Sequence, residues 1–365
     1  MEDEEFMREA LRIAKNALGR TSPNPLVGAV VVKDGKIVAE GWHRQAGTPH
    51  AEIHALNMAG ELAKGATLYV TLEPCSHFGR TPPCAQKIIE CGIKKVVAAM
   101  EDPNPKVSGR GFELLKSAGI EVEAGILEAE ARKLNEVFIK WVTTGLPFVT
   151  MKFASSLDGK IATATGESQW ITCLESRKFV HKLRDINDAV LVGIGTVLAD
   201  NPSLTTRLID GKSPIRIILD SKARIPLDSK VLTDKSARTI IAVTENAPSE
   251  KISAIKNCGA EIIIAGDEQV DFKILMKELA RREITSVLVE GGGQVHFSML
   301  KAGLVDKIYG FMAPKIIGGE KSLTSVEGEG FLKLSEAITL KNFTSEKIGE
   351  DILISGYVKG DFAWK

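Results

Sequence analysis

The chain has 365 residues, and its 47 Lys and Arg balance its 47 Asp and Glu to a formal net charge of zero. This length suits two domains better than one, and the zero net charge argues against a broad electrostatic partnership with nucleic acid. No apolar run approaches the roughly 20 residues that span a bilayer, and the acidic N-terminus is unlike a targeting peptide. We therefore expect a cytoplasmic protein that binds neither nucleic acid nor membranes.

Helix and strand patterns alternate along the first 145 residues. Apolar residues at helical spacing predict a helix over residues 5–18, and the apolar runs 27–32 and 36–40 flank Asp34-Gly35, which predicts a hairpin. Further helices are expected at residues 50–63, 84–91, 109–118 and 128–143, and further strands at 67–72, 95–100 and 120–124. This order predicts a layered α/β domain.

Residues 49–84 contain a cluster typical of a zinc site. His50 opens one predicted helix, Cys75 follows a predicted strand, and Cys84 follows two prolines at the start of the next helix. One imidazole and two thiolates fit a tetrahedral Zn²⁺ and leave its fourth position open for water. Glu52 is not needed for coordination and is placed to move protons for that water. The pattern predicts a catalytic site.

A structural zinc site is the alternative interpretation. A closed site uses four protein ligands, and His77 or His54 is then the candidate for the fourth. A structural site has no use for a glutamate two residues after its histidine, which favours catalysis. The five cysteines fit a reducing compartment, and those outside the cluster show no partner spacing and are expected to be packing residues: Cys91, Cys173 and Cys258.

The cluster matches one half of a known signature. His50-Ala51-Glu52 agrees with the zinc nucleobase deaminases, but residues 76–83 separate the two cysteines where that signature has two residues. The long loop 75–84 resembles the deaminase domain of the bifunctional riboflavin-biosynthesis deaminase/reductases. The resemblance implies a cytidine-deaminase-like three-layer fold for residues 1–145.

The same resemblance implies substrate contacts in this domain. Asn24, in the Pro-Asn-Pro turn, and His43 are expected to line the pyrimidine pocket. His77 and Arg80 lie on the loop between the cysteines, where they are placed to meet the polar tail of the substrate. An arginine at this position can hold a phosphate.

The second domain is predicted to span residues 146–365. Val- and Ile-rich runs predict a largely parallel sheet covered on both faces, with strands at 148–153, 189–193, 215–219, 239–243, 261–265 and 286–289. Glycines 291–293 join a strand to a helix at 295–301, an arrangement that suits phosphate binding. The turn 220–224 suits the 2′-phosphate of NADP, and a solvated basic turn is the alternative.

Three segments of this second half look like the reductase domain of the same family: residues 151–160, 166–171 and 195–207. The resemblance implies a dihydrofolate-reductase-like fold that binds NADPH through Ala154, Trp170, Thr196, Asp200, Ser221, Gly292, Gly293, Gln294, Val295, His296, Phe297 and Ser298. It implies substrate contacts at Ser168, Arg184, Leu204, Arg207 and Glu290, beside which Lys152 is placed to steer or protonate the sugar oxygen.

These expectations describe a bifunctional enzyme of riboflavin biosynthesis with Zn²⁺ and NADPH as cofactors. It would deaminate a small pyrimidine ribotide, 2,5-diamino-6-(5-phosphoribosylamino)pyrimidin-4(3H)-one, and then reduce the ribosyl side chain to ribityl, giving 5-amino-6-(5-phosphoribitylamino)uracil. We also expect a homo-oligomer. The rival interpretations are a deaminase of RNA bases with an RNA-binding second half, and a zinc-stabilised scaffold without catalysis.

Overall fold

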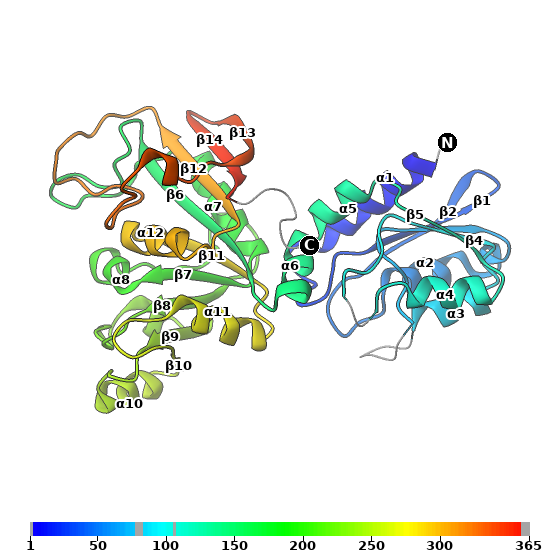
Figure 1. Ribbon diagram of the computed structural model, residues 1–365, viewed down its shortest axis with the longest axis horizontal. Helices are drawn as coiled ribbons and strands as arrows, with labels where there is room; N and C mark the ends of the chain where they lie inside the picture. Colours follow the sequence, from blue (N-terminus) through cyan, green and yellow to red (C-terminus); the bar gives the residue numbers. More distant parts are fainter. Residues whose placement is uncertain (1–2, 77–82, 105–106, 359–365) are drawn as a thin grey trace. The chain divides into compact units, whose positions relative to one another are not determined.

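The computed structural model describes residues 3–76, 83–104 and 107–358. The chain divides into two compact units, of which the first takes up Met1–Gly145 and the second begins at Leu146 (Figure 1). Among the described residues, no helix has both the length and the apolar character that crossing a membrane requires.

The first unit is built on a five-stranded sheet in the order β2-β1-β3-β4-β5. Strand β1 is antiparallel to β2 and β3, whereas β3, β4 and β5 are parallel. Its strands are β1 Gly28–Lys33, β2 Lys36–Trp42, β3 Thr67–Val70, β4 Lys95–Ala98 and β5 Glu121–Ala124, and its helices are α1 Asp3–Ala14, α2 Ala51–Ala59, α3 Cys84–Glu90, α4 Arg110–Ser117, α5 Glu128–Leu134 and α6 Glu136–Thr144. Helices α1 and α5 lie on one face of the sheet and α2, α3 and α4 on the other (Figure 1). This confirms the predicted three-layer domain.

The hairpin between β1 and β2 forms where the sequence predicts it. Asp34 and Gly35 both have positive φ angles, 49° and 72°. Two consecutive residues of positive φ make the tight turn whose twist matches that of the flanking strands, and Asp-Gly is a favoured pair for it.

The helix predicted over residues 50–63 is shorter in the structure. Helix α2 ends at Ala59, and a 3₁₀ turn, Gly60–Ala63, completes the segment.

The prediction of one continuous helix over residues 128–143 is wrong. The helix breaks at Asn135, which lies between α5 and α6 with a φ of −105° and a ψ of 20°. The buried Asn135 amide accepts a hydrogen bond from the Leu26 N–H at 2.8 Å and donates one to the Leu26 carbonyl at 3.0 Å. This side chain therefore substitutes for a backbone partner of the segment that leads into β1.

The second unit contains a nine-stranded sheet in the order β10-β9-β8-β7-β11-β6-β12-β14-β13. All neighbours from β10 to β12 are parallel, which confirms the predicted parallel sheet, while β14 and β13 add an antiparallel edge that was not predicted. The strands are β6 Phe148–Ser156, β7 Ala189–Gly193, β8 Ile215–Leu219, β9 Thr239–Val243, β10 Glu261–Ile264, β11 Ser286–Gly291, β12 Lys307–Ala313, β13 Lys341–Ile348 and β14 Asp351–Tyr357.

Both faces of the parallel part of this sheet are buried. Leu191 packs in a cluster with side chains of α11 and α12, whereas its neighbours Val190 and Val192 pack in a second cluster with α8, α9 and α10. Alternate residues of a strand face opposite sides, so a strand with apolar residues throughout needs helices on both. The helices are α7 Leu174–Ile186, α8 Ile194–Asp200, α9 Lys230–Thr233, α10 Ser249–Asn257, α11 Phe272–Arg281 and α12 Gly293–Lys301.

Candidate metal centre and cofactor cleft

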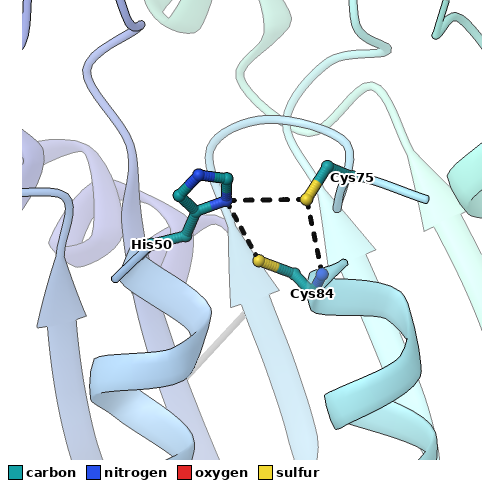
Figure 2. A group of neighbouring side chains, drawn as sticks. All are labelled: His50, Cys75 and Cys84. Atoms are coloured by element: carbon teal, nitrogen blue, oxygen red, sulfur yellow. Dashed lines mark hydrogen bonds between the residues drawn. The ribbon is translucent and has the colours of Figure 1, made fainter. Parts of the chain in front are cut away.

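Three potential metal ligands converge in the first unit. His50, Cys75 and Cys84 offer ligand atoms that all lie within 4.8 Å of one another. The His50 Nδ1 atom is 3.2 Å from the Cys84 Sγ and 3.5 Å from the Cys75 Sγ. Figure 2 shows the imidazole at the start of one helix, one thiol on the loop after β3 and the other at the start of a second helix. One nitrogen and two sulfur donors at this spacing suit Zn²⁺.

Local structure explains why these three groups meet. His50 is the residue that precedes α2, and Cys84 is the first residue of α3 after Pro83. The Cys84 N–H donates to the Cys75 Sγ at 3.3 Å, and the Ala85 N–H donates to the Cys75 carbonyl at 3.1 Å. The free N–H groups at the start of a helix therefore hold the other cysteine in place.

The electrostatics of the cluster favour a thiolate and a proton carrier. The hydrogen bond from the Cys84 thiol lowers the pKa of Cys75 below its ordinary value, and His50 acts in the same direction. Burial raises the pKa of Glu52 to about 7. His50, Cys75 and Cys84 also influence the pKa of Glu52, so this carboxyl lies beside the candidate ligands. A carboxyl with a pKa near neutrality can both accept and release a proton during a reaction.

The described residues supply three ligands and do not add a fourth. His54 lies outside the cluster, so the described residues do not support a closed site completed by that histidine. His77 and Arg80, the other predicted residues of this region, lie outside the described residues.

Asn24 and His43 form a pair beside His50, one of the candidate metal ligands. The Asn24 Nδ2 is 3.0 Å from the His43 Nε2, and the His43 Nδ1 is 3.2 Å from the Pro49 carbonyl oxygen. The rings of His43 and His50 meet edge to face at 5.3 Å. A carbonyl only accepts, so the His43 Nδ1 carries the proton and its Nε2 accepts from the Asn24 amide. Burial lowers the pKa of His43, which favours this neutral form.

The second unit has a cleft of about 560 Å³ at the carboxyl ends of β7, β8 and β11. Ligands of parallel α/β sheets bind at this edge. Gly292 and Gly293 stand where β11 passes into α12, and a Cβ on Gly293 would lie 2.7 Å from the Glu327 Cγ. Many of the predicted cofactor contacts line this cleft, together with the predicted substrate contact Ser168: Thr196, Asp200, Ser221, Gly292, Gly293, Gln294, Val295 and Ser298.

Four of the predicted cofactor contacts do not line the cleft. Ala154 packs against the apolar cluster of Phe311 and Leu353, and His296 is buried with its Nδ1 2.7 Å from the Ser325 carbonyl oxygen. Phe297 packs against Phe331. Trp170 is exposed and carries the Arg177 guanidinium 4.3 Å above its ring. Successive residues of a helix point in different directions, so only part of the run 292–298 faces the cleft.

Beside the cleft lies a cluster of charged residues around Glu290, near the end of β11. The Arg184 guanidinium donates to both Glu290 carboxylate oxygens, at 2.6 and 2.8 Å, and to the Thr205 carbonyl at 3.0 Å. Burial opposes ionisation of Glu290, but Arg184 outweighs it and lowers the Glu290 pKa to about 2. Burial lowers the pKa of Lys152, on which the charge of Glu290 acts in the opposite direction.

His181 belongs to this cluster and was not predicted. Its Nδ1 accepts a hydrogen bond from the Arg207 N–H at 2.8 Å, and burial together with Arg184 and Arg207 lowers its pKa to about 4. The sequence could have placed His181 beside Arg184, because residues three apart on a helix share a face and His181 precedes Arg184 by three. Leu204, another predicted substrate contact, is buried and has a positive φ of 52°.

Comparison with known families gives a match for each unit. Residues 1–100 match the cytidine and deoxycytidylate deaminase zinc-binding region, and residues 147–354 match the RibD C-terminal domain. The fold and the two sites therefore define a chain that joins a deaminase domain of the zinc-binding type to a reductase domain.

Full-length relatives give the family. The chain is 49% identical to the riboflavin biosynthesis protein RibD of Aquifex aeolicus over 96% of its own length and 97% of the relative. It superposes on Acinetobacter baumannii RibD with a TM-score of 0.89 at 39% identity, covering 97% and 98% of the two chains. It also superposes on the diaminohydroxyphosphoribosylaminopyrimidine deaminase/5-amino-6-(5-phosphoribosylamino)uracil reductase of Thermotoga maritima, with a TM-score of 0.87, 44% identity and the same coverage. The chain belongs to the RibD family of bifunctional riboflavin-biosynthesis enzymes.

Membership confirms the predicted family, fold class and pair of enzyme activities. It also decides against the rival interpretations. The second half matches a reductase family rather than an RNA-binding module, and the first half matches an enzyme domain rather than a scaffold.

Proposed function

We propose that the first unit deaminates 2,5-diamino-6-(5-phosphoribosylamino)pyrimidin-4(3H)-one with Zn²⁺, held by His50, Cys75 and Cys84. The convergence of these three donors beside the buried Glu52 carries this proposal. Zinc, when bound, lowers the pKa of a water molecule in its open position to about 7. The protein's own part is to move protons and to orient the substrate.

Glu52 is the proposed acid and base of the first reaction. It takes a proton from the attacking water, delivers it to the ring nitrogen, and assists the departure of ammonia. Asn24 and His43 are proposed to hold the pyrimidine. His43 takes one of the two N–H groups of the Asn24 amide. The other N–H can donate to the substrate, and the Asn24 oxygen can accept from it. His77 and Arg80 remain predicted contacts for the substrate's polar tail.

The second unit is proposed to bind NADPH and to reduce the ribosyl group of the deaminated product to ribityl. The cofactor would lie in the cleft, with its phosphates at the start of α12, where backbone N–H groups of a helix face outwards. The nicotinamide supplies the hydride, and the protein orients the reactants and excludes water. Ala154, Trp170, His296 and Phe297 stay predicted contacts, although they do not line the cleft.

The charged cluster is proposed to hold the second substrate. Arg207 and Arg184 add positive charge that suits a ribose phosphate. Lys152 is proposed to steer or protonate the sugar oxygen, and the bidentate Arg184–Glu290 pair fixes the end of β11 next to the cleft. Ser168 and Leu204 complete the predicted set. A cytoplasmic location and a homo-oligomeric state also remain part of the proposal.

Arg224 is expected to set the preference for NADPH over NADH. It lines the cleft beside Ser221 with its side chain largely exposed, and its Nε atom lies 3.9 Å from the Asp220 carboxylate. Asp220 is fully buried and accepts from the Ile225 N–H at 2.8 Å, so it faces its own turn. We expect Arg224→Ala to raise the KM for NADPH about tenfold or more, the order of one charge-assisted pair, and to leave the KM for NADH unchanged.

Steady-state kinetics with each cofactor would check this prediction. Lys222→Ala removes a positive charge from the same turn, but from a residue that does not line the cleft, and is the matched control. Equal effects of Arg224→Ala on both cofactors would contradict the assigned role.

A one-pot assay tests the proposed function as a whole. The purified chain is given the diaminopyrimidinone ribotide, and ammonia and nicotinamide absorbance are followed with and without NADPH. We expect ammonia in both cases and NADPH oxidation only after deamination. Removal of zinc by a chelator should stop ammonia release, while reduction of the already deaminated product continues. Ammonia release at the full rate by metal-free protein would refute the zinc assignment.

A further inference from the structure

Glu73 is a buried carboxylate for which the proposed chemistry has no role. It is 3% exposed and lies between the end of β3 and Cys75. One carboxylate oxygen accepts from the N–H groups of Asp102 at 3.1 Å and Gly109 at 3.0 Å. The other accepts from Gly111 at 2.8 Å and Phe112 at 3.4 Å. All four donors belong to the backbone of the segment that follows β4.

This arrangement makes Glu73 the acceptor for the start of α4. The first N–H groups of a helix have no partner within it, and a negative charge is stabilised there by the helix dipole. A carboxylate that is withdrawn from water persists only where hydrogen bonds replace its hydration. Glu73 therefore connects the end of β3 to the end of β4 and to α4, three elements that are distant in the sequence.

At Gly111 the start of α4 contacts Pro74, the residue before Cys75. A Cβ at Gly111 would lie 2.0 Å from the Pro74 carbonyl oxygen and 3.0 Å from the Glu73 carboxylate. No side chain fits in that space, so the start of α4 touches the peptide unit directly before Cys75. The Glu73 backbone is held as well, because its N–H donates to the Met100 carbonyl at 3.0 Å.

The contacts continue from Cys75 to Cys84. The Cys75 sulfur accepts from the Cys84 N–H, and the Cys75 carbonyl accepts from the Ala85 N–H. A displacement of Glu73 and Pro74 is thereby transmitted to both thiols.

We propose that Glu73 is a positioning residue of the metal centre, which holds Pro74 and Cys75 where the two thiols and His50 converge. The inference rests on the proposed zinc-dependent deamination. It assigns to Glu73 no contact with metal or substrate, and its effect is expected on zinc retention and on the rate of deamination.

Glu73→Gln tests the proposal, because the amide keeps the size of the side chain but replaces one acceptor oxygen with an NH₂ group. That group cannot accept the hydrogen bonds that two of the four backbone N–H groups donate. We expect zinc transfer to a chromophoric chelator to become at least tenfold faster. The kcat of deamination should fall about tenfold or more while its KM changes less than threefold. The cobalt-substituted variant should show shifted thiolate-to-metal absorption bands. Reduction of the deaminated product by the same chain is an internal control and should keep the wild-type rate.

Two further variants make the outcome decisive. Gly111→Ala leaves residue 73 a glutamate but forces the start of α4 away from Pro74 and from the Glu73 carboxylate, and it should give the same pattern. Glu113→Gln removes a negative charge from an exposed position on the same helix and should change nothing. If Glu73→Gln fails to fold, Gly111→Ala decides the question. A folded variant with wild-type zinc transfer, cobalt spectrum and kcat would overturn the proposal, since it would leave Glu73 a merely structural role. Wild-type protein that binds no zinc would refute the proposed function itself.

Discussion

Glu52→Gln is expected to lower the kcat of deamination by about 10²- to 10⁴-fold, the usual contribution of a positioned acid or base. The amide fills the same buried space next to the ligands but cannot carry a proton from the water to the ring nitrogen. Ammonia release from the ribotide in the steady state is the measurement. Zinc content should stay at the wild-type level, because Glu52 is not a ligand in this arrangement.

The matched control is Glu61→Gln, the same chemical change at an exposed position in the 3₁₀ turn after α2. It should leave deamination unchanged. NADPH oxidation with the deaminated product should be normal in both variants. Ammonia release by Glu52→Gln within tenfold of the wild-type rate would sink the assignment of the acid and base.

Arg184→Met is expected to abolish reduction and to destabilise the second unit by about 3–5 kcal/mol, the usual cost of removing one partner of a buried ion pair. The variant leaves the Glu290 carboxylate buried without the two hydrogen bonds that Arg184 donates. Deamination should persist. Denaturant unfolding and the rate of NADPH oxidation are the two measurements, with Lys182→Met, an exposed change on the same helix, as the control.

The double variant Arg184→Met/Glu290→Met separates stability from chemistry. Removing both charges should recover much of the lost stability, because no buried carboxylate is left unpaired, while reduction stays absent. A double variant as unstable as Arg184→Met would show that the ion pair does not account for the loss.

Acid should reveal the same pair in the wild-type protein. The folded-state pKa of Glu290, about 2, lies below its ordinary value of 4.5. Its contribution to stability is therefore fully present above pH 4.5 and is lost as the pH falls towards 2, by an amount on the order of 3 kcal/mol. The Arg184→Met/Glu290→Met variant should lack this part of the pH dependence. The measurement is the free energy of unfolding of the second unit as a function of pH.

The regular parts of both units could be predicted from local patterns. Asp34-Gly35 indicates its own turn type, and the apolar strands β7, β8 and β9 were predicted with the bounds they have in the structure. The candidate metal ligands could be picked out as well, because one imidazole and two thiols lie at the ends of successive predicted elements and a glutamate follows the histidine by two residues.

Features that depend on distant partners could not be predicted. Asn135 breaks a helix through a hydrogen bond to Leu26, which is 109 residues away in the sequence. Strand β13 is almost entirely exposed, so it lacks the apolar alternation that marks a strand. The acceptor role of Glu73 depends on N–H groups that lie 29 to 39 residues later. For Asn135 and Glu73 the decisive partners are backbone groups, which residue type hardly distinguishes.

The cofactor contacts show a different limit. A run of seven neighbours, Gly292 to Ser298, was predicted to touch NADPH, but consecutive residues of a helix point about 100° apart. Only those on one side of α12 line the cleft, and His296 and Phe297 are buried on the other. Helical periodicity alone would have divided this set.

The order of strands also has a consequence for synthesis on the ribosome. Strands β1 to β5 all lie within the first unit and can pair as soon as that part of the chain has emerged. The second unit differs, because Thr150 of its first strand pairs with Leu288 on one side and Lys307 on the other. At about 5–20 residues per second, β6 waits roughly 7 to 30 s for these neighbours. Throughout that interval β6 is a largely apolar strand with two unpaired edges, the kind of segment that can pair with a strand of another chain.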